Sequence, residues 1–346
     1  MIKYWLFVFI VCIAVTGCKK SESNNITNER IIPLSPDEYG IYRDRHGNYY
    51  DSEKKWLALR TPDFEELLRL ENITENVENL DIEYDNPITD IGFFGSLPKL
   101  KFLRCPGFLN IRDLEPLRYL HDLERMDLAT ASDMDVLPLK SLKNLKGIRL
   151  YCRNKFVNID ALSELENLVS LKLCSHDKME LKGIASLPKL KTLEILVSSE
   201  IDMAYIGTMQ NLESLMVSSP NIKNLIGLKN PTLFSLDLLG MYDYESESSF
   251  YDGELNLDDL LNLQELKDLS VRRIGINDVT PLLKMKKLEK IYFEHNTVDI
   301  APLARSNTIK KIHIDIEQYY NTPKTVFEQK GIRVYNVHSD DYGHNE

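Results

Sequence analysis

The side chains able to do chemistry in this sequence are seven histidines, five cysteines and many carboxylates, and their spacing argues against an active site. No Gly-x-Ser-x-Gly, phosphate-binding loop, His-Glu-x-x-His or Cys-x-x-Cys motif is present. The later histidines have no acidic or cysteine partner at a recurring spacing: His121, His176, His295 and His313. His295 and His313 could approach each other, but surface histidines are the better interpretation. We expect no catalytic residue, no metal site and no cofactor.

An acidic, aromatic stretch at 241–259, MYDYESESSFYDGELNLDD, is the second group of reactive side chains. Carboxylates alternating with aromatic rings could grip a basic partner. On this hypothesis the contacting residues are Tyr242, Asp243, Tyr244, Glu245, Phe250 and Tyr251. Calcium is a weaker hypothesis, because the carboxylate spacing does not match an EF-hand loop. The alternative is a tolerated surface insertion without a function of its own.

The overall charge limits the partners. The chain of 346 residues is 43% hydrophobic and 27% charged, with a net charge of −11. An acidic surface repels phosphate backbones, so we expect no nucleic-acid partner. The composition is that of a protein with ample apolar material for a core.

The amino terminus has the organisation of a secretion signal. Lys3 precedes an apolar run from Tyr4 to Val15, which is too short for an ordinary membrane span. The residues Val15-Thr16-Gly17-Cys18 resemble a bacterial lipobox, the signature of lipoproteins. The resemblance implies cleavage after residue 17 and diacylglyceryl transfer to Cys18, which would anchor the chain to a membrane. The alternative is a signal peptide with a chance cysteine.

Residues 18–76 are predicted to form a tether and an N-terminal cap. The polar segment 18–36 cannot bury apolar surface and should act as a flexible tether. In the predicted cap, 37–76, the sequence DRHGN reads as a hairpin turn, and TPDFEELLRLEN reads as a helix with Thr61 as N-cap. We interpret His46 in the turn as a solvated loop residue rather than a ligand.

Apolar residues then recur in phrases of about 22 residues. Each phrase ends in the pattern apolar-x-x-apolar-x-apolar, as in LERMDL, LKGIRL and LKTLEI. The first apolar residues of successive phrases are Val77, Leu100, Leu123, Leu145, Leu168, Leu190, Leu212, Leu233, Leu266, Leu288 and Ile309. One interval, from Leu233 to Leu266, is 33 residues, so 33 − 22 = 11 extra residues fall within the stretch 241–259.

Each period holds two kinds of segment. The final apolar-x-apolar pair alternates as a short strand does. The preceding apolar series has a spacing of three residues, which matches a 3₁₀ helix. One such coil cannot bury its own leucines, whereas stacked coils share a continuous core. We therefore predict that Leu171, Leu193 and Leu215 lie one above another in adjacent layers.

This pattern over 77–316, with phrases such as IRDLEPL and INDVTPL, resembles leucine-rich repeat proteins of the short, internalin-like class. The resemblance implies an α/β solenoid of about ten coils, with a parallel β-sheet on the concave face and 3₁₀ or short helical turns on the convex face. The asparagine usual after the strand is mostly missing, with Asn only at 296. Residues 317–346 read as a C-terminal cap and tail, with a helix around 323–329 and a strand at 332–337.

The residues between the paired strand leucines should face outward on the sheet. Large apolar residues fall in predicted exposed positions across three coils: Leu196, Val197, Met216, Phe234 and Leu239. Rows of exposed apolar residues mark binding surfaces, so we predict a partner patch formed by Leu196, Met216, Phe234, Leu239 and Tyr292. The alternative is local irregularity that buries some of these side chains.

The remaining cysteines indicate little chemistry. Cys105 occupies a leucine position and should be a core residue. Cys152 and Cys174 lie in neighbouring coils but are offset by one position, so they should point to opposite faces. A disulfide between them is therefore disfavoured.

These features predict a lipid-anchored envelope protein, at the outer membrane or cell surface, whose repeats bind another macromolecule. The expected partner is a protein of a host or of the envelope, and the label of adhesin follows from the resemblance alone. The alternative is a structural or scaffold lipoprotein of the periplasm or envelope. An enzyme is a remote third hypothesis.

Overall fold

The computed structural model describes a body within residues 34–346, which is one of two compact units of the chain. The described ranges are 36–63, 65–68, 73–84, 88–109, 111–199, 201–220, 222, 225–240, 255–296 and 298–337. The predicted signal peptide, Cys18 and most of the tether lie outside these residues. Among the described residues, no helix has the length and apolarity needed to cross a membrane.

A single sheet of fifteen strands runs through the body. It begins with an antiparallel pair, β1 (Ile41–Arg43) and β2 (Tyr49–Asp51), and β3 (Trp56–Leu59) pairs with β2 antiparallel and with β4 parallel. From β4 onward every neighbour is parallel. The parallel strands are β4 (Asn79–Ile82), β5 (Phe102–Leu109), β6 (Arg125–Thr130), β8 (Gly147–Cys152), β10 (Ser170–Ser175), β11 (Thr192–Val197), β12 (Ser214–Ser219), β13 (Ser235–Gly240), β14 (Asp268–Arg272), β15 (Lys290–Glu294), β16 (Lys311–Ile314) and β17 (Arg333–Asn336).

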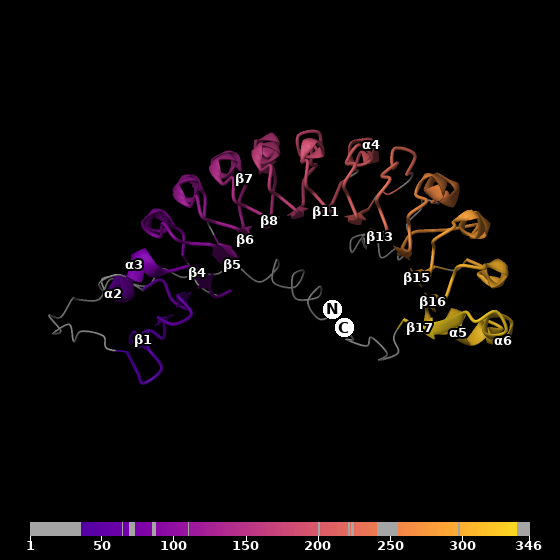
Figure 1. Cartoon of the computed structure of the whole chain (residues 1–346), viewed down its shortest axis with the longest axis horizontal. Helices are drawn as coiled ribbons and strands as arrows, with labels where there is room; N and C mark the ends of the chain where they lie inside the picture. Colours follow the sequence, from indigo (N-terminus) through magenta and orange to yellow (C-terminus); the bar gives the residue numbers. More distant parts are fainter. Residues whose placement is uncertain are drawn as a thin grey trace. The chain divides into compact units, whose positions relative to one another are not determined.

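Short helices connect these strands on the opposite side of each coil. Figure 1 shows the strands along the inner side of the curved body and the helices along its outer side. The helices are η1 (Gly92–Ser96), η2 (Glu115–Tyr119), η3 (Leu137–Ser141), η4 (Ile159–Glu164), η5 (Ile184–Ser186), α4 (Met203–Ile206), η6 (Leu257–Asn262), η7 (Thr280–Lys284) and η8 (Ala301–Arg305). Most are 3₁₀ helices, which confirms the prediction from the three-residue spacing. A small second sheet pairs β7 (Met134–Asp135) with β9 (Phe156–Val157).

The core is a stack of aligned leucines. Leu171 pairs in register with Leu193, and Leu193 pairs in register with Leu215. All three side chains are buried within one continuous apolar cluster that extends through the coils. The predicted layering is confirmed. Because the leucines point into the core, the residues between them on each strand must point to the opposite, concave face of the sheet.

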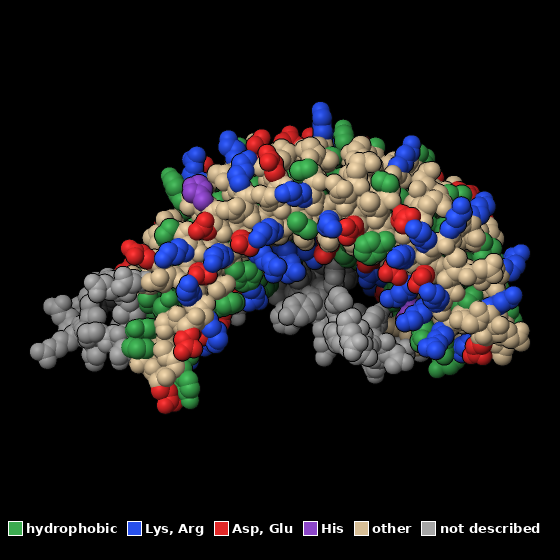
Figure 2. All heavy atoms as spheres, in the orientation of Figure 1, with side chains coloured by type: hydrophobic (Ala, Val, Ile, Leu, Met, Phe, Trp, Pro, Cys, Tyr) green, Lys and Arg blue, Asp and Glu red, His purple; other side chains and the backbone are tan. Residues whose placement is uncertain are grey.

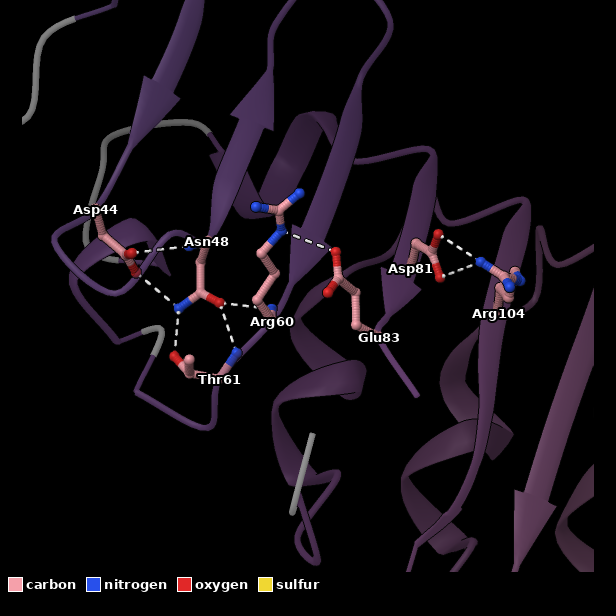
Figure 3. Close-up of polar contacts among 7 residues, drawn as sticks. All are labelled: Asp44, Asn48, Arg60, Thr61, Asp81, Glu83 and Arg104. Atoms are coloured by element: carbon pink, nitrogen blue, oxygen red, sulfur yellow. Dashed lines mark hydrogen bonds and ion pairs between the residues drawn. The ribbon is translucent and has the colours of Figure 1, made fainter. Parts of the chain in front are cut away.

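The N-terminal end is closed by a hairpin held by one asparagine. The predicted turn is confirmed, because residues 44–48 join β1 to β2. The buried Asn48 side chain donates to Asp44 Oδ2 at 2.8 Å and to Thr61 Oγ1 at 3.1 Å, and it accepts from the backbone N–H groups of Arg60 and Thr61 (Figure 3). The following residues form the short helices α2 (Glu65–Leu68) and α3 (Ile73–Asn76).

The C-terminal end carries the predicted helix and strand. Two helices, α5 (Ile316–Asn321) and α6 (Lys324–Glu328), precede β17, which pairs in parallel with β16. Phe327 of α6 is fully buried and covers the end of the core. The cap therefore lengthens the sheet by one strand, β17, whose side chains lie in register with those of the repeat strand β16.

The three described cysteines, Cys105, Cys152 and Cys174, form no disulfide with one another. Cys105 is a core residue, as predicted, and burial raises the pKa of its thiol to about 12. Cys152 pairs in register with Ser175, whereas Cys174 pairs with Tyr151, so the predicted offset is confirmed. Cys152 is buried and Cys174 lies on the other face of the sheet, and the two form no disulfide.

The extra residues of the long interval fall mostly outside the described chain. Tyr242, Asp243, Tyr244, Glu245, Phe250 and Tyr251 all belong to the undescribed segment 241–254. Residues 255–259 belong to the regular coil, because Leu255 and Leu257 are buried. The Asn256 side chain there accepts from the N–H of Asp258 at 3.0 Å and caps η6.

Candidate binding surface on the concave face

Three rows of side chains cover the concave face of the sheet. We call the middle one the central row, and register places its members side by side. It consists of Asp81, Arg104, Asp127, Arg149, Lys172, Glu194, Met216, Asp237, Ser270, Tyr292, His313 and Tyr335. The leading row lies two residues earlier on each strand, and the trailing row two residues later. All three face away from the leucine core, because side chains alternate along a strand.

The N-terminal half of the central row neutralises itself. Arg104 Nη1 donates to both oxygens of Asp81, at 3.1 and 2.9 Å (Figure 3). Lys172 Nζ lies 2.7 Å from Glu194 Oε2. Charges of opposite sign on neighbouring strands therefore satisfy one another, and little net charge is left for a partner.

The carboxylate of Asp127 is largely buried within this part of the face. It lies between Arg104 and Arg149 in the central row, with Arg149 Nη1 4.0 Å away. One of its oxygens is buried and accepts no hydrogen bond. Burial raises the pKa of Asp127, and the nearby guanidinium groups offset this only in part.

A second set of charges runs along the edge where the strands begin. We call it the rim row: Glu78, Lys101, Glu124, Lys146, Val169, Lys191, Glu213, Phe234, Lys267, Glu289 and Lys310. From Lys101 onward, each residue donates its backbone N–H to the carbonyl of the previous member. Lysine and glutamate alternate, with N···O distances of 2.7 Å for Lys101–Glu78, Lys146–Glu124 and Lys191–Glu213. Figure 2 shows Lys and Arg side chains in blue intermixed with Asp and Glu side chains in red along the visible face of the body.

Only two members of the rim row are apolar. Val169 is 36% exposed and Phe234 is 39% exposed. Phe234 therefore lies at the edge of the sheet, beside the start of β13, and not within the central row. Its exposure agrees with the prediction, while its partner-binding role stays a prediction.

The prediction of exposure is wrong for three other residues of the middle coils. Leu196 and Leu239 are only 7% and 8% exposed, although both belong to the trailing row. The small Ser218 lies between them in register and is itself fully buried. Val197 is buried because alternation places it on the core face with Leu193.

Met216 and Tyr292 are partly exposed members of the central row, as predicted, but they are not neighbours. Met216 is on β12 and Tyr292 is on β15, three strands further along the sheet. The five predicted patch residues therefore do not form one continuous surface.

Tyr292 instead opens a stack of three rings at the C-terminal end. The rings of Tyr292 and His313 have centroids 5.7 Å apart, and those of His313 and Tyr335 are 4.9 Å apart at an interplanar angle of 15°. Burial, together with the charges of Lys290 and Lys311, lowers the pKa of His313 to about 4. The imidazole is therefore neutral at pH 7.

A run of cations flanks this stack. Lys290, Lys311 and Arg333 are exposed and occupy successive positions of the leading row. None of them makes an ion pair within 4.0 Å with a described residue. Figure 2 shows blue side chains at the inner edge of the C-terminal end. Arg125 is also exposed in the leading row without an ion pair among the described residues, so the C-terminal end is distinguished by three such cations in succession.

Sequence reasoning missed both features of the C-terminal end. Tyr335 and Arg333 belong to the predicted C-terminal cap, whose strand was not counted among those that form the binding face. The signal was present, because IRVYNV repeats the alternation of the earlier strand phrases. The cations without an ion-pair partner could be recognised only once the register between neighbouring strands showed which charged side chains lie next to each other.

The described residues contain no group of three or more His, Cys, Asp or Glu side chains placed to hold a metal ion. The histidines are dispersed: His176 is on the loop after β10, His295 follows β15 and His313 is within β16. His295 donates its backbone N–H to Asp315 Oδ2 at 2.5 Å. The chemistry of the surface is therefore that of charge pairs, apolar side chains and stacked rings.

The stacked coils, the parallel inner sheet and the outer 3₁₀ helices define a leucine-rich repeat solenoid. No family model and no curated protein sequence matches the chain significantly. Among solved structures, an internalin (inlF) from Listeria monocytogenes matches with 20% identity and a TM-score of 0.55, over 84% of this chain and 89% of that chain. The structure of PEPR1-AtPEP1 matches with 15% identity and a TM-score of 0.50, over 88% of this chain and 50% of that chain. At these identities the likeness concerns the fold.

Proposed function

We propose that this chain is a binding scaffold that holds a protein partner on the concave face of its repeats. The observation that carries the proposal is the uneven distribution of side chains on that face. The first six members of the central row are all charged and most of them pair with one another, whereas its later members include the partly exposed Met216 and Tyr292. Phe234 is exposed at the rim, beside the middle of this row. Partly exposed apolar and aromatic residues surrounded by paired charges have the composition of a protein interface.

The internalin-like fold supports this proposal by analogy, because a solenoid presents an extended concave surface. We further propose lipid anchoring through Cys18, on the basis of the sequence Val15-Thr16-Gly17-Cys18. The anchored chain would act at the bacterial cell surface as an attachment protein. A periplasmic scaffold is the second candidate, since the same face could hold another envelope protein.

The binding proposal is tested with the full-length chain in mild detergent, cross-linked to proteins of host-matrix and envelope extracts. Phe234→Glu should abolish capture of the partner, because it places a charge where an apolar contact is expected. The matched control is Val169→Glu, which changes the other apolar member of the rim row, three coils away. Equal capture by both variants would refute a role for the middle coils.

The anchor and its location have separate tests. Cells fed a clickable palmitate analogue should label the wild-type chain, and Cys18→Ser should lose both the label and partitioning into the detergent phase. Protease treatment of intact cells should release the repeat body if it faces outward. A protected body that becomes sensitive only after the outer membrane is opened would favour the periplasmic scaffold.

A further inference from the structure

The C-terminal end of the concave face differs in charge from the rest. In the rim and central rows, most lysines and arginines have a carboxylate partner on a neighbouring strand. Lys290, Lys311 and Arg333 occupy three successive positions of the leading row without such a partner among the described residues. The acidic Asp268 is the register neighbour of Lys290, but the two form no ion pair within 4.0 Å.

The aromatic stack adds a second feature that favours anions. Tyr292, His313 and Tyr335 stack face to face along the sheet, so the stack covers both faces of the His313 ring and one face of each tyrosine ring, and the ring edges border the concave space. The edge of an aromatic ring carries the positive part of its quadrupole. Stacked edges beside a row of cations therefore give a surface that is electropositive over two adjacent rows.

We infer that this end of the face binds an extended acidic segment of a partner protein. The inference rests on the proposed function, and it adds that the part of the partner bound at the C-terminal end of the face is acidic. Neighbouring strands are about 4.8 Å apart, so the three cations span about 10 Å. Acidic side chains at positions i and i+2 of an extended segment are about 7 Å apart, within reach of flexible lysines. Aromatic or apolar side chains of the segment would pack against the ring edges.

A protein segment fits better than a nucleic acid. The chain has a net charge of −11, which repels a long polyanion. The basic row is only three residues long and is bordered by Asp268 and by Glu289, which pairs with Lys310 at 2.9 Å. A short acidic segment can use the three cations without approaching the acidic remainder of the surface.

The probe is a fluorescein-labelled peptide of alternating glutamate and serine, about twelve residues long, with a glutamine–serine peptide as the neutral counterpart. Fluorescence anisotropy with the full-length chain in mild detergent measures binding at about 50 mM salt, where screening is weak. The acidic peptide should bind and the neutral peptide should not. Lys290→Gln with Lys311→Gln should weaken binding about tenfold, since each substitution removes one charge pair between the peptide and an exposed lysine.

Two further variants keep the test independent of folding. Lys290→Arg with Lys311→Arg retains the charges and should bind as the wild type does. The matched control is Lys101→Gln with Lys146→Gln, which removes two rim charges that already have partners at 2.7 Å. Circular dichroism should be unchanged in all three double variants.

Several outcomes would overturn the inference. One is equal binding of the acidic peptide by the Lys290/Lys311 and Lys101/Lys146 glutamine variants. Another is tighter binding of a single-stranded oligothymidylate of equal charge than of the acidic peptide. Binding that appears only after deletion of residues 339–346, which contain Asp340 and Asp341, would assign the site to the chain's own acidic tail. Loss of partner capture on Phe234→Glu would still support the proposed function in any of these cases, so the two failures are distinguishable.

Discussion

Replacing His313 by phenylalanine should make the protein relatively more stable in acid. The ring of His313 lies between those of Tyr292 and Tyr335, and burial with two nearby lysines lowers its pKa to about 4 from an ordinary 6.5. Between these pH values the unfolded chain binds a proton at His313 and the folded chain does not. Stability is therefore lost as pH falls from 6.5 toward 4, and phenylalanine, which keeps a ring in the stack, removes this loss.

The magnitude follows from the pKa difference. A difference of 6.5 − 4 = 2.5 in pKa corresponds to about 3.4 kcal/mol at 1.36 kcal/mol for each pKa unit. The His313 ring is partly exposed and the two lysines are solvated, so screening reduces this to about 1–2 kcal/mol. Relative to wild type, His313→Phe should therefore gain about 1–2 kcal/mol of unfolding free energy between about pH 7 and pH 4.5.

The assay is urea unfolding of the full-length chain, followed by circular dichroism at several pH values between about 7 and 4.5. Changes at other titrating groups cancel in the difference between the two proteins. Tyr335→Phe is the control, because it retains both the stack and the imidazole and should show the wild-type pH dependence. Parallel stability curves for wild type and His313→Phe, or an NMR titration of His313 with a midpoint near the ordinary 6.5, would refute the reasoning.

Three further substitutions test the fold. Leu193→Ala, in the centre of the leucine stack, should lower the unfolding free energy by roughly 2–5 kcal/mol in urea titrations, and a loss below about 1 kcal/mol would contradict the layered core. Gly227→Ala should lower the melting temperature, because its Cβ would lie 2.5 Å from Ala204 Cα, whereas Gly147→Ala meets only an ordinary contact and should melt as the wild type does. Asn48→Asp should cost roughly 3 kcal/mol and speed hydrogen exchange in residues 41–60, because a carboxylate cannot donate to Asp44; unchanged exchange would show that the cap does not depend on this amide.

The sequence was sufficient to predict the repeat, because the period of the apolar residues is a direct consequence of the coil geometry. Leu171, Leu193 and Leu215 had to stack once the three-residue and two-residue spacings were assigned. Alternation also predicted that Cys152 and Cys174 point to opposite faces and that Met216 faces outward. These features depend on local periodicity, which any single coil reveals.

The burial of individual residues on the concave face could not be predicted from local periodicity. Leu196 and Leu239 face outward by alternation, yet both are buried, because exposure depends on the side chains of the neighbouring strands. Register between coils decides those neighbours, and the register is known only after the coils are aligned. The same limit hid the contribution of Tyr335, which becomes part of the aromatic stack only when β17 pairs with β16.

The distribution of charge explains how an acidic protein can carry a site for an acidic partner. A lysine and a glutamate 2.7 Å apart form a short dipole, and the fields of such pairs cancel within about one Debye length. The alternating rim therefore contributes little to the potential above the concave face, despite its many charges. Lys290, Lys311 and Arg333 lack this compensation among the described residues, so their field reaches further into solution. An approaching acidic segment would be oriented by this end first, and the apolar contacts at Met216 and Phe234 would form after it.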